Sequence, residues 1–419
     1  LAILFNPTLT SINALSGLTS IPQRCDILNN ASLTSLSGLN NLTSIGSTLS
    51  IRDNVNLTNI NDLENLASIG RHLFIVNQPN LVNLVGLGNL SSVGDGLEIV
   101  NNASLSSLSG LENLQTLGGW LEISANPNLI NLSELAGLSV IPGTCYVFDN
   151  ASLVNLTGLN NVASIGEEVV IRNNVSLASL SGLDGLQTIG GWLEIENNPE
   201  LQTLNGLGSL LNIDEDFYIY NHDALESLAG LENLQTIGGG LEFAGNPSLQ
   251  SLSALNSLES IGSFFYVFQT GLTNFDGLGN LQSIGGEVRI IENPDLLDLN
   301  GLNNVASIPT DLYINNNASL TACAIEPICD KLSNPNGAFI SIANNAPTSD
   351  CTDQAAVEAA CTPAPVCPTG DITFSSQAQI DNFPIDYPGC TEITGNVTIT
   401  GADITNLDGL ASVALIGGF

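Results

Sequence analysis

Residues 97–120 read LEIVNNASLSSLSGLENLQTLGGW, and most of the chain repeats this 24-residue unit. The next 24 residues begin LEISANPNL and place apolar residues at the same positions. A unit this short cannot enclose a hydrophobic core alone and buries its apolar edge only by stacking on a neighbour. The repeat therefore predicts a solenoid. The apolar positions of the unit are Leu97, Ile99, Leu105, Leu108, Leu111, Leu114 and Leu117.

With the coil start as slot 1, the template is L-x-I-x-x-N-x-x-L-x-x-L-x-x-L-x-x-L-x-x-I-G-x-x. Slots 1 and 3 are apolar and alternate with mixed residues, which predicts a short strand with one buried face. From slot 9 to slot 21 every third residue is apolar, which indicates extended or 3₁₀-like turns. Slot 22 is Gly, or Pro at residues 22, 142 and 309, and marks a corner. Coils start at Leu1, Cys25, Leu49, Leu73, Leu97, Leu121, Cys145, Val169, Leu193, Phe217, Leu241, Phe265, Val288 and Leu312.

Slot 6 is Asn in most coils. An amide at a corner can donate and accept at once, so it can satisfy backbone groups of its own turn and of the adjacent coil. This predicts a buried ladder of stacked Asn side chains, a simpler explanation than a ligand role. Gln78, His222 and Thr270 interrupt the series, and we expect the ladder to be weaker there.

The chain has 419 residues and a formal net charge of −35, with 6 Lys and Arg against 41 Asp and Glu. A solenoid can reach this length because each coil buries its neighbour rather than one shared core. Nucleic acid and anionic membrane surfaces require basic patches, so neither is an expected partner. No stretch approaches 18 uninterrupted apolar residues, so we expect no membrane span.

Six of the eight cysteines lie close together near the C-terminus. Clustered cysteines in a Lys-poor, Asn-rich chain favour disulfides and an oxidising, extracellular location. A zinc site is the alternative, but no CxxC or HxxxH spacing occurs. We expect Cys367 and Cys390 to be bonded because they bracket one predicted cap. The other four form two bonds with three possible pairings: Cys323, Cys329, Cys351 and Cys361.

Cys25 and Cys145 occupy slot 1, which points inward. Five coils separate them by about 24 Å at the spacing of neighbouring strands. A disulfide requires Cα atoms within about 7 Å. We therefore predict that both are buried free thiols.

The template breaks after Leu320. We expect residues 1–361 to form a solenoid with a C-terminal cap at about 321–361. Residues 362–366 (TPAPV) predict a stiff Pro-rich linker. Residues 367–419 then predict an N-terminal cap and the first coil of a following solenoid. Short helices are expected in the caps, around 325–361 and 375–382, with Ser375 as a helix cap.

The template resembles the receptor L-domain branch of the leucine-rich-repeat proteins, which includes receptor ectodomains and long secreted bacterial members. The cap sequences ACAIEPIC (322–329) and CTEITGNVTITG (390–401) are similar to those of the bacterial surface proteins. The resemblance implies an all-β, right-handed solenoid of 24-residue coils, with one continuous parallel sheet, small helical caps that bear disulfides, and extracellular placement. It transfers no ligand-binding motif.

Nothing in the sequence indicates catalysis. The two histidines, His72 and His222, lie six coils apart, which is about 29 Å at the spacing of neighbouring strands. No GxSxG, HExxH, P-loop or EF-hand motif occurs. We therefore expect no enzyme activity, no cofactor and no metal site.

An uneven aromatic band occupies the outward slots 24, 2 and 4. These side chains are expected to face outward because slots 1 and 3 face the core. Exposed aromatic groups usually mark a contact surface for protein or sugar, although β-propensity alone could also fill a strand with them. The band comprises Trp120, Tyr146, Phe148, Trp192, Tyr218, Tyr220, Phe264, Tyr266, Phe268 and Tyr313.

The favoured function is a non-enzymatic, extracellular structural or adhesive module that binds copies of itself or other surface proteins and glycans. The alternative is an ectodomain that recognises a protein or glycan on the aromatic face. The two ends, IGGF and LAILFNPTL, join in the register of residues 117–129. We therefore expect the sequence to be one period of a tandem or head-to-tail assembly, with Phe419 beside Leu1.

Overall fold

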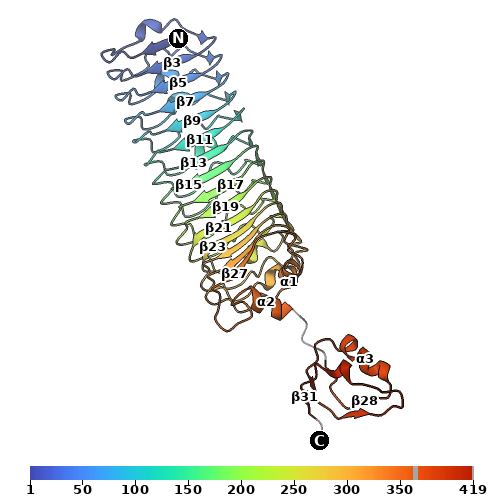
Figure 1. Cartoon of the computed structure of the whole chain (residues 1–419). Coiled ribbons are helices and arrows are strands. Elements are labelled where there is room, and N and C mark those ends of the chain that lie inside the picture. Colours follow the sequence, from blue (N-terminus) through green and yellow to red (C-terminus); the bar gives the residue numbers. More distant parts are fainter. Residues whose placement is uncertain (362–366, 418–419) are drawn as a thin grey trace. The chain divides into compact units, whose positions relative to one another are not determined.

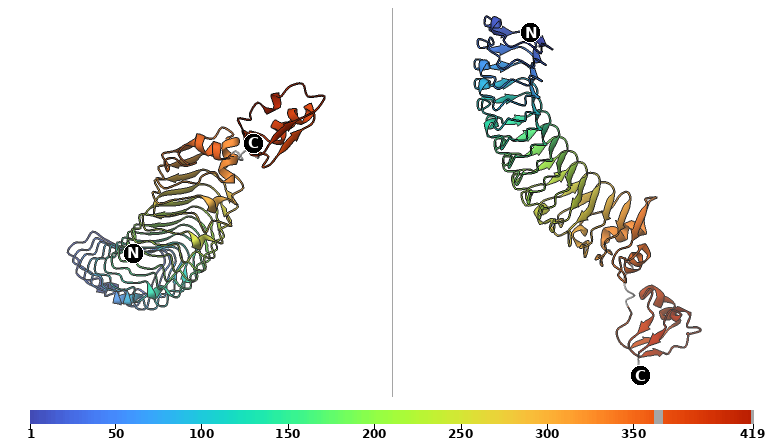
Figure 2. Two further views of the ribbon diagram at one scale, coloured as in Figure 1. Left: turned by 90° about the horizontal axis from the view of Figure 1, so that it is seen from below. Right: turned by 90° about the vertical axis from the view of Figure 1, so that its left-hand side faces the viewer.

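The computed structural model describes residues 1–361 and 367–417. The chain divides into two compact units, Leu1–Gln354 and Ala355–Phe419, each treated separately below. The first unit is a continuous stack of coils (Figures 1 and 2). The expected linker at 362–366 and Phe419 of the expected junction lie outside the described residues.

One sheet runs through the whole first unit. Its fifteen strands are all parallel and follow chain order, and each residue pairs with its counterpart one coil later, as Leu97 does with Leu121. Slots 1 and 3 are buried along the sheet, so the predicted all-β leucine-rich-repeat solenoid is confirmed. The strands are β1 (Ala2–Leu4), β3 (Cys25–Leu28), β5 (Leu49–Arg52), β7 (Leu73–Val76), β9 (Leu97–Val100), β11 (Leu121–Ser124), β13 (Cys145–Phe148), β15 (Val169–Arg172), β17 (Leu193–Glu196), β19 (Phe217–Tyr220), β21 (Leu241–Asn246), β23 (Phe265–Thr270), β25 (Val288–Ile291), β26 (Leu312–Asn315) and β27 (Ile340–Ala343).

The expectation of one sheet was incomplete, because slots 20 and 21 form a second, discontinuous series of two-residue strands. A five-stranded sheet and a seven-stranded sheet follow each other along the stack. The first contains β2 (Ser20–Ile21), β4 (Ser44–Ile45), β6 (Ser68–Ile69), β8 (Ser92–Val93) and β10 (Thr116–Leu117). The second contains β12 (Val140–Ile141), β14 (Ser164–Ile165), β16 (Thr188–Ile189), β18 (Asn212–Ile213), β20 (Thr236–Ile237), β22 (Ser260–Ile261) and β24 (Ser283–Ile284).

Proline at slot 22 determines where these minor sheets end. In an ordinary coil the slot-22 N–H donates to the preceding coil, as Gly118 does to the carbonyl of Val93 at 3.0 Å. Pro142 has no N–H to offer Leu117, and the first minor sheet stops at β10. Pro309 likewise follows β24, the last strand of the second. The corner residue identified in the sequence therefore also acts as a sheet breaker.

The turns between the strands take two forms. In several coils slot 14 is a Gly with positive φ, such as Gly110 at 113°. The other coils form a single 3₁₀ turn at slots 13–15, as predicted in general terms. These turns are η1 (Asn13–Leu15), η2 (Asn61–Leu63), η3 (Val85–Leu87), η4 (Ser133–Leu135), η5 (Ser253–Leu255) and η6 (Asn300–Leu302).

The predicted Asn ladder is present in the structure. The amide of Asn54, fully buried, donates to the carbonyls of Ile27 (2.8 Å) and Arg52 (3.0 Å). Its oxygen accepts from the backbone N–H of Asn30 at 3.1 Å and from the Asn30 amide at 3.2 Å. Each rung therefore joins two coils. At the interruption, the buried side-chain oxygen of Gln78 has no hydrogen-bond partner.

A helical cap closes the C-terminal end of the first unit. It contains α1 (Glu326–Ser333), strand β27 and the start of α2 (Gln354–Cys361). The oxygen of Asn345 accepts from Asn317 at 3.1 and 3.0 Å and so supplies the last rung of the ladder. Cys323 is bonded to Cys351, with Cα atoms 5.3 Å apart, and Cys329 and Cys361 are also disulfide-bonded.

The second unit has its own small core around Phe374, Ile380 and Phe383. The side chain of Ser376, rather than the expected Ser375, accepts from Gln379 and caps its helix. A disulfide joins Cys367 to Cys390, with Cα atoms 5.2 Å apart. The elements are β28 (Ile372–Phe374), α3 (Gln377–Asp386), β29 (Glu392–Ile393), β30 (Val397–Ile399), η7 (Asp408–Leu410) and β31 (Leu415–Ile416).

Cys25 and Cys145 are buried and free in the first unit. Burial raises the pKa of each thiol to about 12. Because the thiolate is the reactive form, both are inert at neutral pH.

Candidate binding face

The outer face of the main sheet carries the ten aromatic residues of the predicted band. All ten are half-buried, with their slot-1 and slot-3 neighbours in the core. Two further rings extend the band and were not among the residues predicted from the sequence. Phe74 lies at slot 2 of β7, where the template rule itself would have found it. Phe339 lies in the cap, outside the template, and its ring centroid is 5.4 Å from that of Tyr313.

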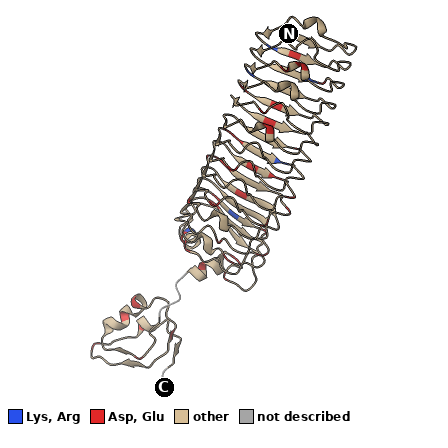
Figure 3. Ribbon diagram, turned by 180° about the vertical axis from the view of Figure 1, so that it is seen from behind, with Lys and Arg blue, Asp and Glu red and all other residues tan. Residues whose placement is uncertain are grey.

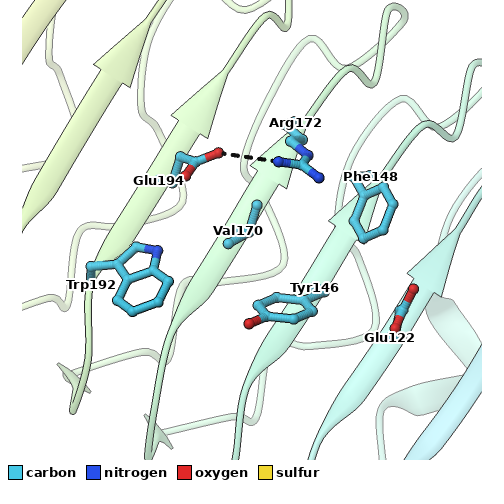
Figure 4. A pocket seen from close by; sticks show the side chains of 7 residues that line it. All are labelled: Glu122, Tyr146, Phe148, Val170, Arg172, Trp192 and Glu194. Carbon is cyan, nitrogen blue, oxygen red and sulfur yellow. Dashed lines mark ion pairs between the residues drawn. The ribbon is translucent and has the colours of Figure 1, made fainter.

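Near the middle of the stack the face contains a shallow depression of about 340 Å³ (Figure 4). Val170 forms its floor because it stands between Tyr146 and Glu194 on adjacent strands and is itself buried. Trp192 and Phe148 complete the apolar part of the lining. Polar groups enter from Glu122, Glu194 and Arg172 at its margin.

The few cations of the chain are concentrated on this face. Three of the five arginines lie over aromatic rings on this face. The guanidinium carbon of Arg52 is 4.4 Å from the ring centre of Phe74, and that of Arg172 is 5.0 Å from Phe148. Arg289 lies between two rings, 5.1 Å from Tyr266 and 4.8 Å from Tyr313.

Each of these arginines also has a carboxylate beside it. The distances are 3.7 Å from Arg52 to Glu98, 3.9 Å from Arg172 to Glu194, and 2.5 Å from Arg289 to Glu287. Acidic residues recur on successive strands, with few basic residues among them (Figure 3). The face as a whole is therefore aromatic and acidic.

Slot 2 alternates charged residues and tyrosines over the C-terminal half of the sheet. Tyr218 donates its hydroxyl to Asp216 at 2.6 Å, and Tyr266 donates to Glu287 at 2.8 Å. Adjacent strands place these residues in register: Glu194, Tyr218, Glu242, Tyr266, Arg289 and Tyr313.

Burial and the neighbouring acids change the protonation of this row. Burial, with the hydrogen bond to Glu287, raises the pKa of Tyr266 to about 12, and the pKa of Tyr218 rises further. Burial also raises the pKa of Glu242 and of Glu194. The phenols therefore remain proton donors at neutral pH.

His72 belongs to the N-terminal part of the face. Its ring stacks on Phe74, with centroids 5.4 Å apart, and lies 5.0 Å from Trp120. Burial lowers the pKa of His72, against the opposing charge of Asp95. His222 is instead a buried member of the Asn ladder. The two histidines do not share a site.

The sequence model of the BspA type leucine rich repeat region matches residues 4–120, 144–263 and 196–319, in 6 copies. These ranges include well over half of the chain. The chain belongs to this family. The resemblance to bacterial surface leucine-rich-repeat proteins is thereby confirmed. No curated protein matches the chain.

BspA-type repeat arrays are interaction or surface modules, and the family is generally non-catalytic. Within residues 1–361 and 367–417, no group of three or more His, Cys, Asp or Glu side chains is placed to hold a metal ion. In the same residues, no helix combines the length and apolar character needed to cross a membrane.

Proposed function

We propose that this BspA-type array is a non-enzymatic, extracellular adhesive module that binds a partner protein on the outer face of its main sheet. The observation that carries the proposal is the number of half-buried aromatic rings, from Trp120 to Tyr313, that lie on one outer face of the main sheet. Half-buried rings in this number supply contact area at a low cost in conformational entropy.

The rest of the chain supports this choice. The disulfides of both caps suit an oxidising location. The sheet is a rigid support because each strand is hydrogen-bonded on both sides from β3 to β26. Rigid presentation of binding side chains reduces the ordering cost of association.

The test uses beads coated with the whole chain, applied to a panel of purified extracellular proteins and to a glycan array. A double variant, Tyr146→Ala with Trp192→Ala, should weaken protein binding at least about tenfold, since buried aromatic anchors dominate interface energies. The matched control is Phe5→Ala, which removes an aromatic ring that is 70% exposed and lies outside the band. Equal binding by the double variant and the control would refute the proposal, and specific binding only to glycans would replace the protein partner by a sugar.

The second candidate is head-to-tail association that extends the stack. The observation that favours it is the apolar edge of the second unit, where Leu415 is 54% and Ile416 is 50% exposed. Ile416 occupies slot 21 of the template, which is buried in the coils of the first unit, so a further coil, from the same polypeptide or another copy, would cover it.

Sedimentation velocity over a range of concentrations tests association between copies. Self-association should increase with concentration and be abolished by Ile416→Asp, because a charge at a coil-to-coil contact is costly to bury. Ile385→Asp is the control, at an exposed position on α3 outside the edge. A chain that remains monomeric at all concentrations excludes assembly of separate copies.

A further inference from the structure

The sheet face holds its own arginine side chains in one recurrent way. At Arg52, Arg172 and Arg289 an aromatic ring lies beneath the guanidinium and a carboxylate lies beside it. Arg289 is the most complete case because tyrosines on both neighbouring strands flank it. Cation–π attraction and a charge-assisted contact act together in this arrangement.

A fourth group on the same face has rings and a carboxylate, and only one of its rings, that of Tyr266, contacts an arginine of the chain, Arg289. Glu242 on β21 stands between Tyr218 on β19 and Tyr266 on β23, in register. Phe264 stacks with both tyrosines, with centroid distances of 6.3 and 4.4 Å. Tyr220 interacts electrostatically with Glu242, and burial together with the charge of Glu242 raises the pKa of the Tyr220 hydroxyl. Four rings therefore surround one carboxylate.

The charge of this group is only partly compensated. Burial raises the pKa of Glu242, although its interaction with Tyr220 and the charge of Arg289 act in the opposite direction. Arg289 itself contacts Glu287 rather than Glu242. Neither β19 nor β21 carries a Lys or Arg. A cation brought by another molecule would therefore gain the same ring and carboxylate contacts that the chain gives its own arginines.

We propose that Glu242, with Tyr218, Tyr220, Phe264 and Tyr266, forms a pocket for an arginine side chain of the partner protein. This inference rests on the proposed function and specifies the chemistry of the partner. A guanidinium fits better than an ammonium because its flat, weakly hydrated surface stacks on rings and its edge donates to a carboxylate. A neutral sugar would leave the carboxylate without a counter-charge.

Tyrosine fluorine NMR on the whole chain tests the pocket directly. Of the six tyrosines, Tyr146, Tyr218, Tyr220, Tyr266 and Tyr313 lie on the face, while Tyr387 lies in the second unit and serves as an internal reference. The protein is labelled with 3-fluorotyrosine, and the signals are assigned by single Tyr→Phe variants. The probes are blocked Gly-Gly-X-Gly-Gly peptides in which X is arginine, lysine or citrulline, at physiological salt.

The arginine peptide should shift the signals of Tyr218, Tyr220 and Tyr266 saturably, and those of Tyr146 and Tyr313 less. Glu242→Gln should weaken this binding about tenfold, since it removes the charge partner. The control Glu226→Gln removes an exposed carboxylate from the coil that contains β19, outside the sheet face, and should change binding less than about twofold. The lysine peptide should bind more weakly, and the citrulline peptide should produce no saturable shift.

Equal shifts with arginine and citrulline, equal effects of the two Glu→Gln changes, or no saturable shift would each overturn the arginine pocket. The proposed function fails separately. If the Tyr146→Ala, Trp192→Ala double variant loses partner binding while Glu242→Gln retains it, the face binds a partner but the pocket is wrong. If neither variant loses partner binding, the face itself is not the binding surface.

Discussion

The main sheet and the minor sheets respond differently to a residue that departs from the coil template. The main sheet continues through fifteen strands, past Gln78, His222 and Thr270 in its Asn ladder. The minor series, with two-residue strands, ends at Pro142 and again at Pro309. A four-residue strand has several backbone hydrogen bonds on each side, so the sheet survives one poor rung. A poor rung beside the main sheet still lowers the free energy of unfolding, because polar atoms remain buried without hydrogen-bond partners.

The largest expected effect on the free energy of unfolding is the loss of one Asn from the ladder beside the main sheet. Asn150 donates to Ile123 (2.8 Å) and Phe148 (3.0 Å) and accepts from the backbone N–H of Asn126 (3.1 Å). Asn150→Ala leaves these three backbone groups buried without this partner, which should lower the free energy of unfolding by about 4 kcal/mol. Urea denaturation measures it. In the same coil as Asn126, the exposed Asn128 donates only to Ala103 (2.7 Å), so Asn128→Ala should cost less than about 1 kcal/mol.

His222 should make the ladder sensitive to pH. Burial lowers the pKa of His222 to about 4. Between the ordinary value and about 4, the unfolded chain binds a proton that the folded chain does not, so stability falls as pH falls through this window. The loss amounts to about 3 kcal/mol and levels off below it. The difference between the stability–pH curves of the wild type and His222→Asn isolates this effect from the acidic residues. Curves that run parallel over the whole window would contradict it.

Gln78→Asn should repair the ladder. The longer side chain leaves its oxygen buried without a hydrogen bond, whereas asparagine at slot 6 accepts from the preceding rung. We expect the free energy of unfolding to rise by about 1–2 kcal/mol. Thermal unfolding by calorimetry measures it, and a lower melting temperature than the wild type would show that the site has adapted to glutamine.

The smallest effect on the free energy of unfolding is expected at Pro142, where the first minor sheet ends. Pro142→Gly restores an N–H that can donate to Leu117 and join the two minor sheets. The gain from one hydrogen bond is about 1 kcal/mol, and the loss of the rigid proline in the unfolded chain is of similar size. Stability should therefore change by less than about 1 kcal/mol, while the amide of residue 142 becomes protected from hydrogen exchange. A large destabilisation would mean that the proline has a further role in the corner.

The fold could be predicted largely because one template occurs so often. The apolar spacing predicts buried slots at Leu97 and Ile99, and the Asn series predicts the ladder. Both predictions need only the residue types at fixed positions of one coil. The minor sheets were missed because slots 20 and 21 belong to a period-three pattern, and only the neighbouring coil shows that their backbones pair. Ser376 rather than Ser375 caps α3 for a local reason: Ser375 instead donates to the Gln379 side chain through its backbone N–H and hydroxyl.

The sequence predicts which residues lie on the outer face of the main sheet, but not which of their side chains contact one another. The band from Trp120 to Tyr313 follows from the alternation along each strand. The positions of Arg172 over Phe148 and of Glu242 among four rings depend on rotamers and on strands 24 or more residues apart, which a linear pattern does not encode.

The hydrogen bonds that join the coils of the first unit run along the direction in which the stack extends. A force that pulls its two ends apart would load these bonds in tension, one coil boundary at a time, rather than shear many strands together. Each coil that detaches would release 24 residues, which span about 80 Å when extended, in place of one strand spacing of about 4.8 Å. Under load such a module would lengthen in equal steps, and the hydrogen bonds of its Asn ladder would contribute to the force needed for each step.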